Sequence, residues 1–391
     1  MFAFLKNARK GFSLIFPIFI VLFVAACQPS STSSGPTINT SKPVRVALLI
    51  PGESASAGDN IIARSLENAA RLAISDLEGV QIDLRVYSTS GNAEKAASVA
   101  VAAVDDGAQI ILGPLYGESA NAVGLALSNK NINILAFSNK PSIAGGNVFV
   151  LGNTFQNTAE RIVSYSVNQG RRNVMIVHGA DNVSEEAGRD ALVQAANRNG
   201  ATITGVPSFE MSQQGVINAI PNIAAQARNS GTDAILFASG TEGALPLLTQ
   251  LLPENGINTE TTQFIGLTRW DIPTATLSLP GVQGAWFALP DPGLSNRYIA
   301  RYSAAFGEPP HPISGLAYDG IAAIGALVKS GSSNALTSAA LTQSSGFVGV
   351  NGVFRLLPDG TNQRGLAIAQ VQENQVIVID PAPRSFSGSG F

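Results

Sequence analysis

The chain has 391 residues; hydrophobic residues make up 45% of it, charged residues make up 13%, and the formal net charge is −3. A chain this apolar is not intrinsically disordered, and its slight excess of acidic side chains argues against a nucleic-acid partner, which needs a basic face. One cysteine and two histidines exclude an internal disulfide and leave too few ligands for a cysteine-rich metal site. We therefore expect no metal, no cofactor and no nucleic acid.

Residues 1–26 have the pattern of a secretory signal peptide. Lys6, Arg9 and Lys10 precede the almost wholly apolar run 11–26, and a basic start, a short apolar run and small residues before a boundary are typical of such a leader. The run is short for a membrane span, which needs about 20 residues. A permanent N-terminal membrane anchor is the alternative interpretation.

The end of this segment, Ala25-Ala26-Cys27, resembles the bacterial lipobox, in which the cysteine is acylated and becomes the first mature residue. The resemblance implies that Cys27 is a lipid attachment point on the periplasmic side of a bacterial membrane. Gln28 stands where enteric bacteria use aspartate for inner-membrane retention, which favours the outer membrane. Residues 27–42 are rich in serine and threonine and predict a flexible tether with a reach of roughly 20 Å.

A first series of apolar runs and amphipathic segments follows the tether. Ile62, Leu66 and Ala69 show the three- and four-residue spacing that predicts a helix. The predicted strands of this series are 44–51, 81–87, 109–112, 132–137 and 147–151, and its predicted helices are 59–79, 93–105 and 118–128. Continuous apolar strands that alternate with helices predict a parallel sheet covered on both faces.

The same rhythm then starts again. The second series has predicted helices at 155–169, 184–199 and 243–252 and predicted strands at 173–177, 201–204, 233–238 and 263–267. Two such series predict an α/β fold with two similar, doubly wound parallel-sheet lobes. Residues 356–379 differ, since their period-two stretches predict antiparallel strands around a turn at Asp359-Gly360. Residues 383–391 are expected to form a loose tail.

The sequence lacks the motifs of several common enzymes. It has no Ser-x-x-Lys, no Gly-x-Ser-x-Gly and no Gly-Lys-Ser/Thr, which excludes the matching nucleophiles and the Walker phosphate loop. His178 follows a predicted buried strand and His311 lies among prolines, so both are interpreted as structural or surface histidines. We therefore expect a non-enzymatic protein without catalytic residues.

Polar or glycine-rich loops follow seven predicted strands, at the sheet edge where open α/β sheets bind ligands. These loops are 51–54, 113–119, 138–139, 153–154, 179–182, 239–242 and 268–271. Each loop alone is explained by helix capping and turns, but together they favour a shared cleft. Tyr116 and Trp270 either pack against a ligand or seal contacts between the lobes.

The stretch 87–119 (YSTSGNAEKAASVAVAAVDDGAQIILGPLYGES) and the segment 315–328 (GLAYDGIAAIGALV) resemble the type I periplasmic solute-binding proteins of the leucine/isoleucine/valine-binding group. The resemblance covers about 44–381. It implies two lobes joined by three crossovers near 151–154, 288–292 and 331–336. The first lobe would comprise 43–152 with 291–333, and the second 153–290 with 334–382.

This resemblance also implies where a ligand binds. Contacts would come from Gly113, Pro114, Leu115, Ser138 and Asn139 in the first lobe and from Ser239, Gly240 and Thr241 in the second. Further possible cleft positions are Glu53, Ser54, Tyr116, Asn153, Asp181 and Trp270. The family commonly has Tyr-Gly after the strand 173–177, where this chain has HGADN.

The implied function is that of a lipid-anchored receptor that closes on a small, amino-acid-like solute and serves an ABC-type permease. The alternative is a protein similar to the penicillin-binding protein activator lipoproteins, which regulate a peptidoglycan synthase by protein–protein contact. The Gly-Pro-Leu loop at 113–115 and the segment TRWD at 268–271 carry that second resemblance.

Overall fold

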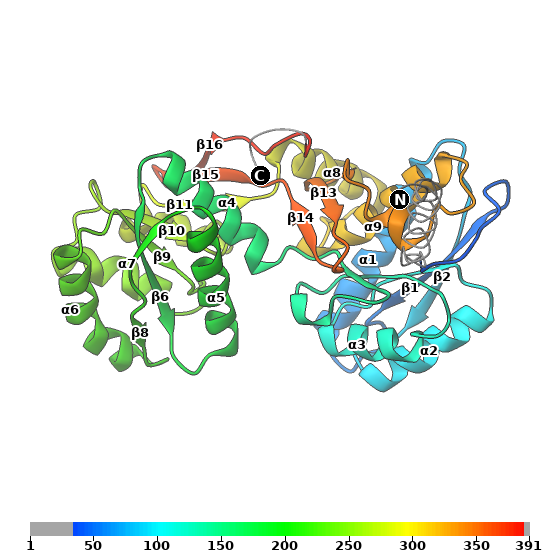
Figure 1. The fold of residues 1–391 in the computed structure, drawn as a ribbon, viewed down its shortest axis with the longest axis horizontal. Helices are drawn as coiled ribbons and strands as arrows, with labels where there is room; N and C mark the ends of the chain where they lie inside the picture. Colours follow the sequence, from blue (N-terminus) through cyan, green and yellow to red (C-terminus); the bar gives the residue numbers. More distant parts are fainter. Residues whose placement is uncertain (1–33, 387–391) are drawn as a thin grey trace, which may run out of the picture. The chain divides into compact units, whose positions relative to one another are not determined.

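The computed structural model describes residues 34–386; the predicted signal peptide, Cys27 and residues 387–391 lie outside the described residues. The described chain has the predicted α/β fold, with two large sheets that are mainly parallel and are covered by helices (Figure 1). No helix in this part of the chain is long and apolar enough to cross a membrane.

The first lobe is built on a five-stranded parallel sheet with the order β2-β1-β3-β4-β5. Its first elements are β1 (Val44–Ile50), α1 (Ala57–Ser75), β2 (Ile82–Ser88), α2 (Ala93–Asp105), β3 (Ile110–Leu112), α3 (Gly117–Ala126), β4 (Ile134–Ala136), the 3₁₀ turn η1 (Pro141–Ile143) and β5 (Val148–Val150). The strands and helices among them were predicted, because their apolar runs and capping residues are local signals. Ser56, for example, accepts a hydrogen bond from the Asp59 amide at the start of α1.

The second lobe is built on the sheet β16-β15-β11-β10-β9-β6-β7, with β8 paired to β6. Its elements are α4 (Phe155–Asn168), β6 (Asn173–Gly179), α5 (Val183–Arg198), β7 (Thr202–Gly205), β8 (Ser208–Phe209), α6 (Gln213–Asn229), β9 (Ala234–Phe237), α7 (Leu245–Glu254), β10 (Gln263–Gly266), η2 (Thr274–Ser278), η3 (Pro280–Val282), β11 (Trp286–Leu289), β15 (Ala367–Gln372) and β16 (Gln375–Asp380). Strands β15 and β16 form an antiparallel edge. Helix α6, whose interior contains Pro221, and the strands β8 and β11 were not predicted from the sequence.

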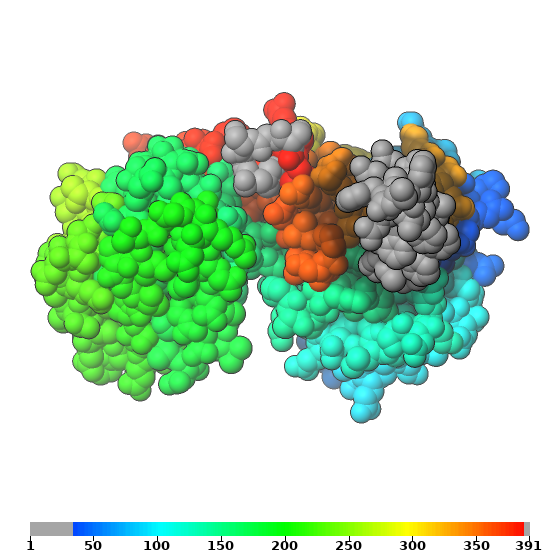
Figure 2. Space-filling model, viewed as in Figure 1, coloured from blue at the N-terminus to red at the C-terminus, as the bar shows by residue number. Residues whose placement is uncertain are grey.

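Three helices and a small sheet complete the first lobe. They are α8 (Pro292–Phe306), α9 (Gly315–Lys329), α10 (Ser338–Leu341), the 3₁₀ turn η4 (Pro312–Ser314), and an antiparallel sheet of β12 (Phe347–Gly349), β13 (Gly352–Leu356) and β14 (Asn362–Arg364). The turn at Asp359-Gly360 joins β13 to β14, as the sequence predicts. The segment that contains β13 and β14, coloured orange, reaches the surface near the junction of the two lobes (Figure 2), although most residues of the two strands are buried.

The third passage of the chain between the lobes differs from the prediction. We expected it near 331–336, with 334–382 in the second lobe. Leu336, Leu341 and Phe354 instead pack in the same hydrophobic cluster as Leu48 of β1. The chain therefore passes to the second sheet only after β14, at 365–366. The apolar pattern of 336–356 predicts that these residues are buried, but it does not indicate which sheet they pack against.

The predicted tether 27–42 is wrong for its described part, since residues 34–42 are packed on the first lobe. Ile38 is only 4% exposed and belongs to the first hydrophobic cluster. The Gly35 amide donates a hydrogen bond to the side chain of Asn131 (2.6 Å), and the Asn133 amide group donates to the carbonyl of Ser34 (3.1 Å). The composition of this segment is typical of linkers, but the segment buries Ile38 and forms hydrogen bonds with residues that are distant in the sequence.

The C-terminal segment is also less loose than predicted for 383–391. The Arg355 guanidinium lies over the ring of Phe386, 4.6 Å from its centroid. Ala382 is buried in a cluster of the second lobe. The segment after β16 therefore returns from the second lobe to the small sheet.

Candidate functional site

A cleft of about 1060 Å³ lies at the carboxyl ends of the parallel strands of both lobes. Its walls come from the segments that follow β3, β4 and β5 in the first lobe and from β11 and the segments that follow β10 and β11 in the second. Apolar side chains dominate the lining and include Leu115, Phe137, Phe155, Leu267, Leu289, Ile313 and Leu316. Open α/β sheets bind ligands at this edge, which makes the cleft the candidate site.

Five of the residues named from the sequence line this cleft. They are Leu115, Tyr116, Ser138, Asn139 and Asn153. The Ser138 hydroxyl accepts a hydrogen bond from the Lys140 amide (3.1 Å), and the Asn153 amide group donates one to Thr158 (3.1 Å). The structure thus brings these five residues together at one cleft, and contact with a ligand stays a prediction for each of them.

Helix α3 begins on the first-lobe wall and leaves its N-terminus without a side-chain cap. Tyr116 is the N-cap residue and makes no capping hydrogen bond, and Gly117, Glu118 and Ser119 line the cleft. The free N–H groups of a helix N-terminus attract anions. Lys140 lies across this end, since its Cδ atom is 2.8 Å from the position that a Cβ of Gly117 would take. Backbone donors and a cation therefore meet on one wall, next to the acidic Glu118.

The ring of Tyr116 is held in place on the same wall. Its hydroxyl donates a hydrogen bond to the Asp59 carboxylate (2.5 Å), whose other oxygen accepts from Ser54 (2.8 Å). The bond to Asp59 and partial burial raise the pKa of Tyr116 to about 12. A Cβ on Gly91 would lie 3.3 Å from the ring, so this glycine makes room for it. The side chain is 39% exposed, which offers a fixed aromatic surface to the cleft.

The second-lobe wall presents Thr268 and Arg269 after β10. The Thr268 hydroxyl oxygen is buried and has no hydrogen-bond partner among the described residues. Arg269 is already paired with Asp271, whose carboxylate accepts from its Nε (2.9 Å). Thr268 therefore carries an unsatisfied polar group on this wall.

Ser239, Gly240 and Thr241, which the resemblance places at the ligand, are not among the residues that line the cleft. Ser239 is fully buried and donates a hydrogen bond to Glu185 (2.8 Å), and the carboxylate of Glu185 also accepts from the Gly179 amide. Thr241 donates to the carbonyl of Ile272 (2.7 Å). These hydroxyl groups therefore bond partners inside the second lobe. No local pattern in the sequence indicates that Glu185, the third residue of α5, is the partner of Ser239.

Six further named residues also lie outside the lining. They are Gly113, Pro114, Glu53, Ser54, Asp181 and Trp270. Gly113 has a φ of +93°, and a Cβ there would lie 2.2 Å from the Leu49 carbonyl oxygen, so its role is structural. Glu53 is paired with Lys95 (3.1 Å), Asp181 is exposed, and Trp270 is fully buried in the second-lobe core. Of the two aromatic residues left open above, only Tyr116 therefore faces the cleft.

Several cleft residues that were not predicted from the sequence come from α8 and from η4 with its N-cap residue. They include Ser295, Tyr298, Ile299, His311 and Ile313. Asp291 caps α8 by accepting from the Leu294 amide (2.9 Å), and Pro292 is the first helical residue. An acidic cap followed by proline is a recognised start signal, so the helix could have been predicted. Its place in the cleft depends on the passage of the chain back to the first lobe.

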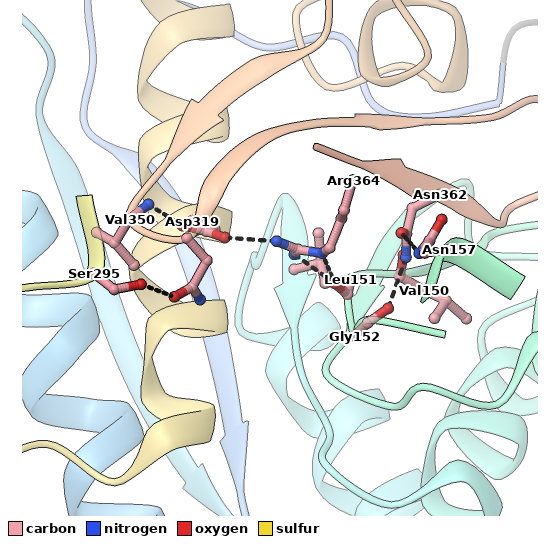
Figure 3. Close-up of polar contacts among 10 residues, drawn as sticks. Val150, Leu151, Gly152, Asn157, Ser295, Asp319, Val350, Asn362 and Arg364 are labelled. Atoms are coloured by element: carbon pink, nitrogen blue, oxygen red, sulfur yellow. Dashed lines mark hydrogen bonds and ion pairs between the residues drawn. The ribbon is translucent and has the colours of Figure 1, made fainter. Parts of the chain in front are cut away.

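Arg364 lines the cleft and belongs to a network of charged and amide side chains where β14 meets the end of β5 (Figure 3). The Arg364 guanidinium donates from Nε to the Leu151 carbonyl (3.0 Å) and pairs with Asp319 of α9 through Nη1 (3.1 Å). Both side chains are buried, and the Asp319 carboxylate also accepts from the Val350 amide (2.7 Å). Burial raises the pKa of Asp319, and the positive charge of Arg364 opposes that rise.

Comparisons with known proteins give a match to one family model, a curated relative and a set of solved structures. The family model described as periplasmic binding protein matches residues 43–375. A curated relative, an uncharacterized protein of Rickettsia prowazekii, is 24% identical over 164 residues, which are 41% of this chain and 43% of that protein. The chain thus spans less than half the length of that relative.

Solved structures share the fold at low sequence identity. A branched-chain amino acid ABC transporter periplasmic ligand-binding protein from Burkholderia xenovorans is 17% identical, with a TM-score of 0.67 over 89% of this chain and 97% of that one. A substrate-binding protein from Desulfitobacterium hafniense in complex with Leu is 16% identical (TM-score 0.62; 86% and 100% covered). A solute-binding protein from Rhodopseudomonas palustris in complex with 3,4-dihydroxybenzoic acid is 16% identical (TM-score 0.57; 89% and 99%).

Proposed function

Because the chain belongs to the periplasmic binding protein family, we propose that it is the non-enzymatic receptor of an ABC-type uptake system and closes its two lobes on a small amino-acid-like solute. The observation that carries this proposal is the first-lobe wall. It combines the uncapped N-terminus of α3 with the opposite charges of Lys140 and Glu118. The carboxylate of a zwitterion can bind the helix N-terminus and Lys140, and its ammonium group can bind Glu118.

In this proposal the carboxylate of the solute sits at the N-terminus of α3, near Lys140 and the Ser138 hydroxyl. Its ammonium group faces Glu118, and its apolar part lies against Leu115 and the Tyr116 ring. The named ligands of two structural relatives, Leu and 3,4-dihydroxybenzoic acid, both carry a carboxylate. That shared group supports the anion half of the site, and the amine distinguishes an amino acid from an aromatic acid.

The second lobe would complete the site through Thr268 in place of Ser239, Gly240 and Thr241. Its buried hydroxyl has no hydrogen-bond partner within residues 34–386, so a ligand that bonds it removes an unsatisfied polar group. Lobe closure on such a ligand is a population shift, which requires that the closed form bind more tightly than the open one.

We also propose that Cys27, outside the described residues, carries the lipid that holds this receptor at the periplasmic side of a membrane, with the outer membrane favoured. Mass spectrometry of the membrane-extracted protein tests this directly. A diacyl or triacyl mass on an N-terminal Cys27 is expected, and an unmodified or uncleaved N-terminus would contradict it.

Calorimetric titration of the full-length protein with the twenty amino acids and with 3,4-dihydroxybenzoate tests the site. We expect an amino acid to bind, and Ser138→Ala and Thr268→Val each to weaken it about five-fold, which is about 1 kcal/mol for one hydrogen bond. Ser166→Ala, in the second-lobe core, is the control and should leave affinity unchanged. Binding of the aromatic acid alone would overturn the amino-acid assignment, and no binding would shift support to the synthase regulator, whose contacts would lie outside the cleft.

A further inference from the structure

Asn362 of β14 stands where the first passage between the lobes begins, and all its polar atoms are used (Figure 3). Its side-chain amide donates to the carbonyls of Val150 (2.7 Å) and Gly152 (2.9 Å), and its oxygen accepts from the amide group of Asn157 (2.7 Å). The side chain is 4% exposed. In this water-poor setting each of these bonds is costly to leave unmade.

The bonds to Val150 and Gly152 support the proposed ligand wall. The Gly152 amide donates to the carbonyl of Ser138 (3.1 Å), and a Cβ on Gly152 would lie only 2.5 Å from that oxygen. Because the backbones of Gly152 and Ser138 are in close contact and share a hydrogen bond, we expect a shift of Gly152 to move Ser138 as well. Arg364, two residues along the same strand, holds Leu151 in the same way.

The bond to Asn157 reaches the other lobe. Asn157 lies in the first turn of α4, whose next turns pack into the second-lobe core through Ala159 and Ile162. The segment 150–152 is fixed to the first lobe by β14 and by Ser138, so we expect the lobes to bend relative to each other at a point between Gly152 and α4. The Asn157–Asn362 hydrogen bond spans that point and is buried on both sides.

We propose that Asn362 is a positioning residue that couples the ligand wall to the movement of the lobes, with the Asn157–Asn362 hydrogen bond as the restraint on the second lobe in the unliganded protein. The part played by the ligand wall rests on the proposed function; the restraint does not. A ligand shifts the equilibrium between the open and closed lobes only by the difference between its affinities for the two states. The free energy needed to break this restraint therefore reduces the binding free energy that is available for closure.

The test measures distances between the lobes without any ligand. Spin labels go on Asn129→Cys and Asn222→Cys, exposed sites in the first lobe and on α6, in the full-length chain with Cys27→Ser. Pulsed electron spin resonance then gives the distance distribution before and after Asn157→Ala. We expect the population at the distance of the present structure to fall about five-fold relative to the others.

Ser166→Ala, a buried polar change on the same helix that touches neither Asn362 nor the cleft, is the matched control and should leave the distribution unchanged. Asn157→Asp keeps the shape but turns a donor toward the Asn362 oxygen into an acceptor, so it should shift the distribution at least as far and keeps the test open if the alanine variant fails to fold. An unaltered distribution in a folded Asn157 variant, or an equal shift in the control, overturns the proposal. Since no ligand is added, this result is separate from the titration of the proposed site.

Discussion

Arg364 and Asp319 form an ion pair from which water is excluded, and their side chains are 5% and 0% exposed. Such a pair contributes little compared with apolar packing, but removal of one partner leaves a buried charge without compensation. We expect Asp319→Asn to lower the free energy of unfolding by about 3–5 kcal/mol, measured by urea unfolding followed by circular dichroism.

The control for this substitution is the exposed pair of Arg71 and Glu67 on α1. Glu67→Gln should cost no more than about 1 kcal/mol, because solvent screens exposed pairs. Equal losses in the two variants would show that burial does not set the cost at Asp319.

We expect His311 at the cleft to make the stability of the protein depend on pH. Partial burial lowers its pKa from the ordinary value of 6.5. Below pH 6.5 the unfolded chain therefore takes up this proton more readily than the folded protein, so stability falls as the pH drops from 6.5 toward the lower folded-state pKa. The free energy of unfolding of His311→Gln should lose this part of the dependence, and a constant difference from the wild type between pH 7.5 and 5.5 would contradict the assignment.

At the residue scale, the sequence is informative where a local pattern defines the role. Ser138 and Asn139 could be placed at the cleft because they directly follow a buried strand. Ser239 has the same pattern, but its hydroxyl donates its hydrogen bond to Glu185 of α5, the helix that follows β6. That partner is 54 positions away, and nothing in the local sequence indicates it.

At the element scale, the segment 34–42 behaves as part of the first lobe. Ile38 buries its side chain in the core that β1 and α1 form. We expect Ile38→Ser to cost about 2–4 kcal/mol of unfolding free energy, through lost burial and a buried hydroxyl. Thr37→Ala, one position earlier and exposed, should cost almost nothing; a Ile38 variant as stable as this control would mean that the segment is the tether that its composition suggests.

Most elements were predictable because strand and helix signals are local, and α2 begins and ends where the sequence indicates. The sheet that an element joins is not a local property. Residues 356–379 were predicted to be antiparallel from their alternation and turn, but the place of β13 and β14 in the first lobe follows from packing that connects distant parts of the chain. That is why the third passage between the lobes was misplaced.

At the scale of the whole molecule, each lobe has its own hydrophobic clusters, and both tryptophans, Trp270 and Trp286, lie in the second. Tryptophan fluorescence thus reports on the second lobe, while circular dichroism reports on both. A ligand that bridges the walls should stabilise both lobes, by about 2.7 kcal/mol at 100 times its dissociation constant. Heating should show both signals shifted upward by a few degrees, and a shift in one signal alone would mean that the ligand touches one lobe.

Residues 34–38 and Phe386 both pack on the first lobe and its small sheet. Two fluorescent domains, one joined before residue 34 and one after Phe386, would therefore both be attached to the first lobe. The distance between them would change little when a ligand binds. The exposed β15–β16 turn at Glu373 and Asn374 belongs to the other body, and both residues have positive φ. A reporter inserted there, paired with one attached at an exposed first-lobe site such as Asn129, would turn the protein into a sensor whose signal follows the angle between the lobes.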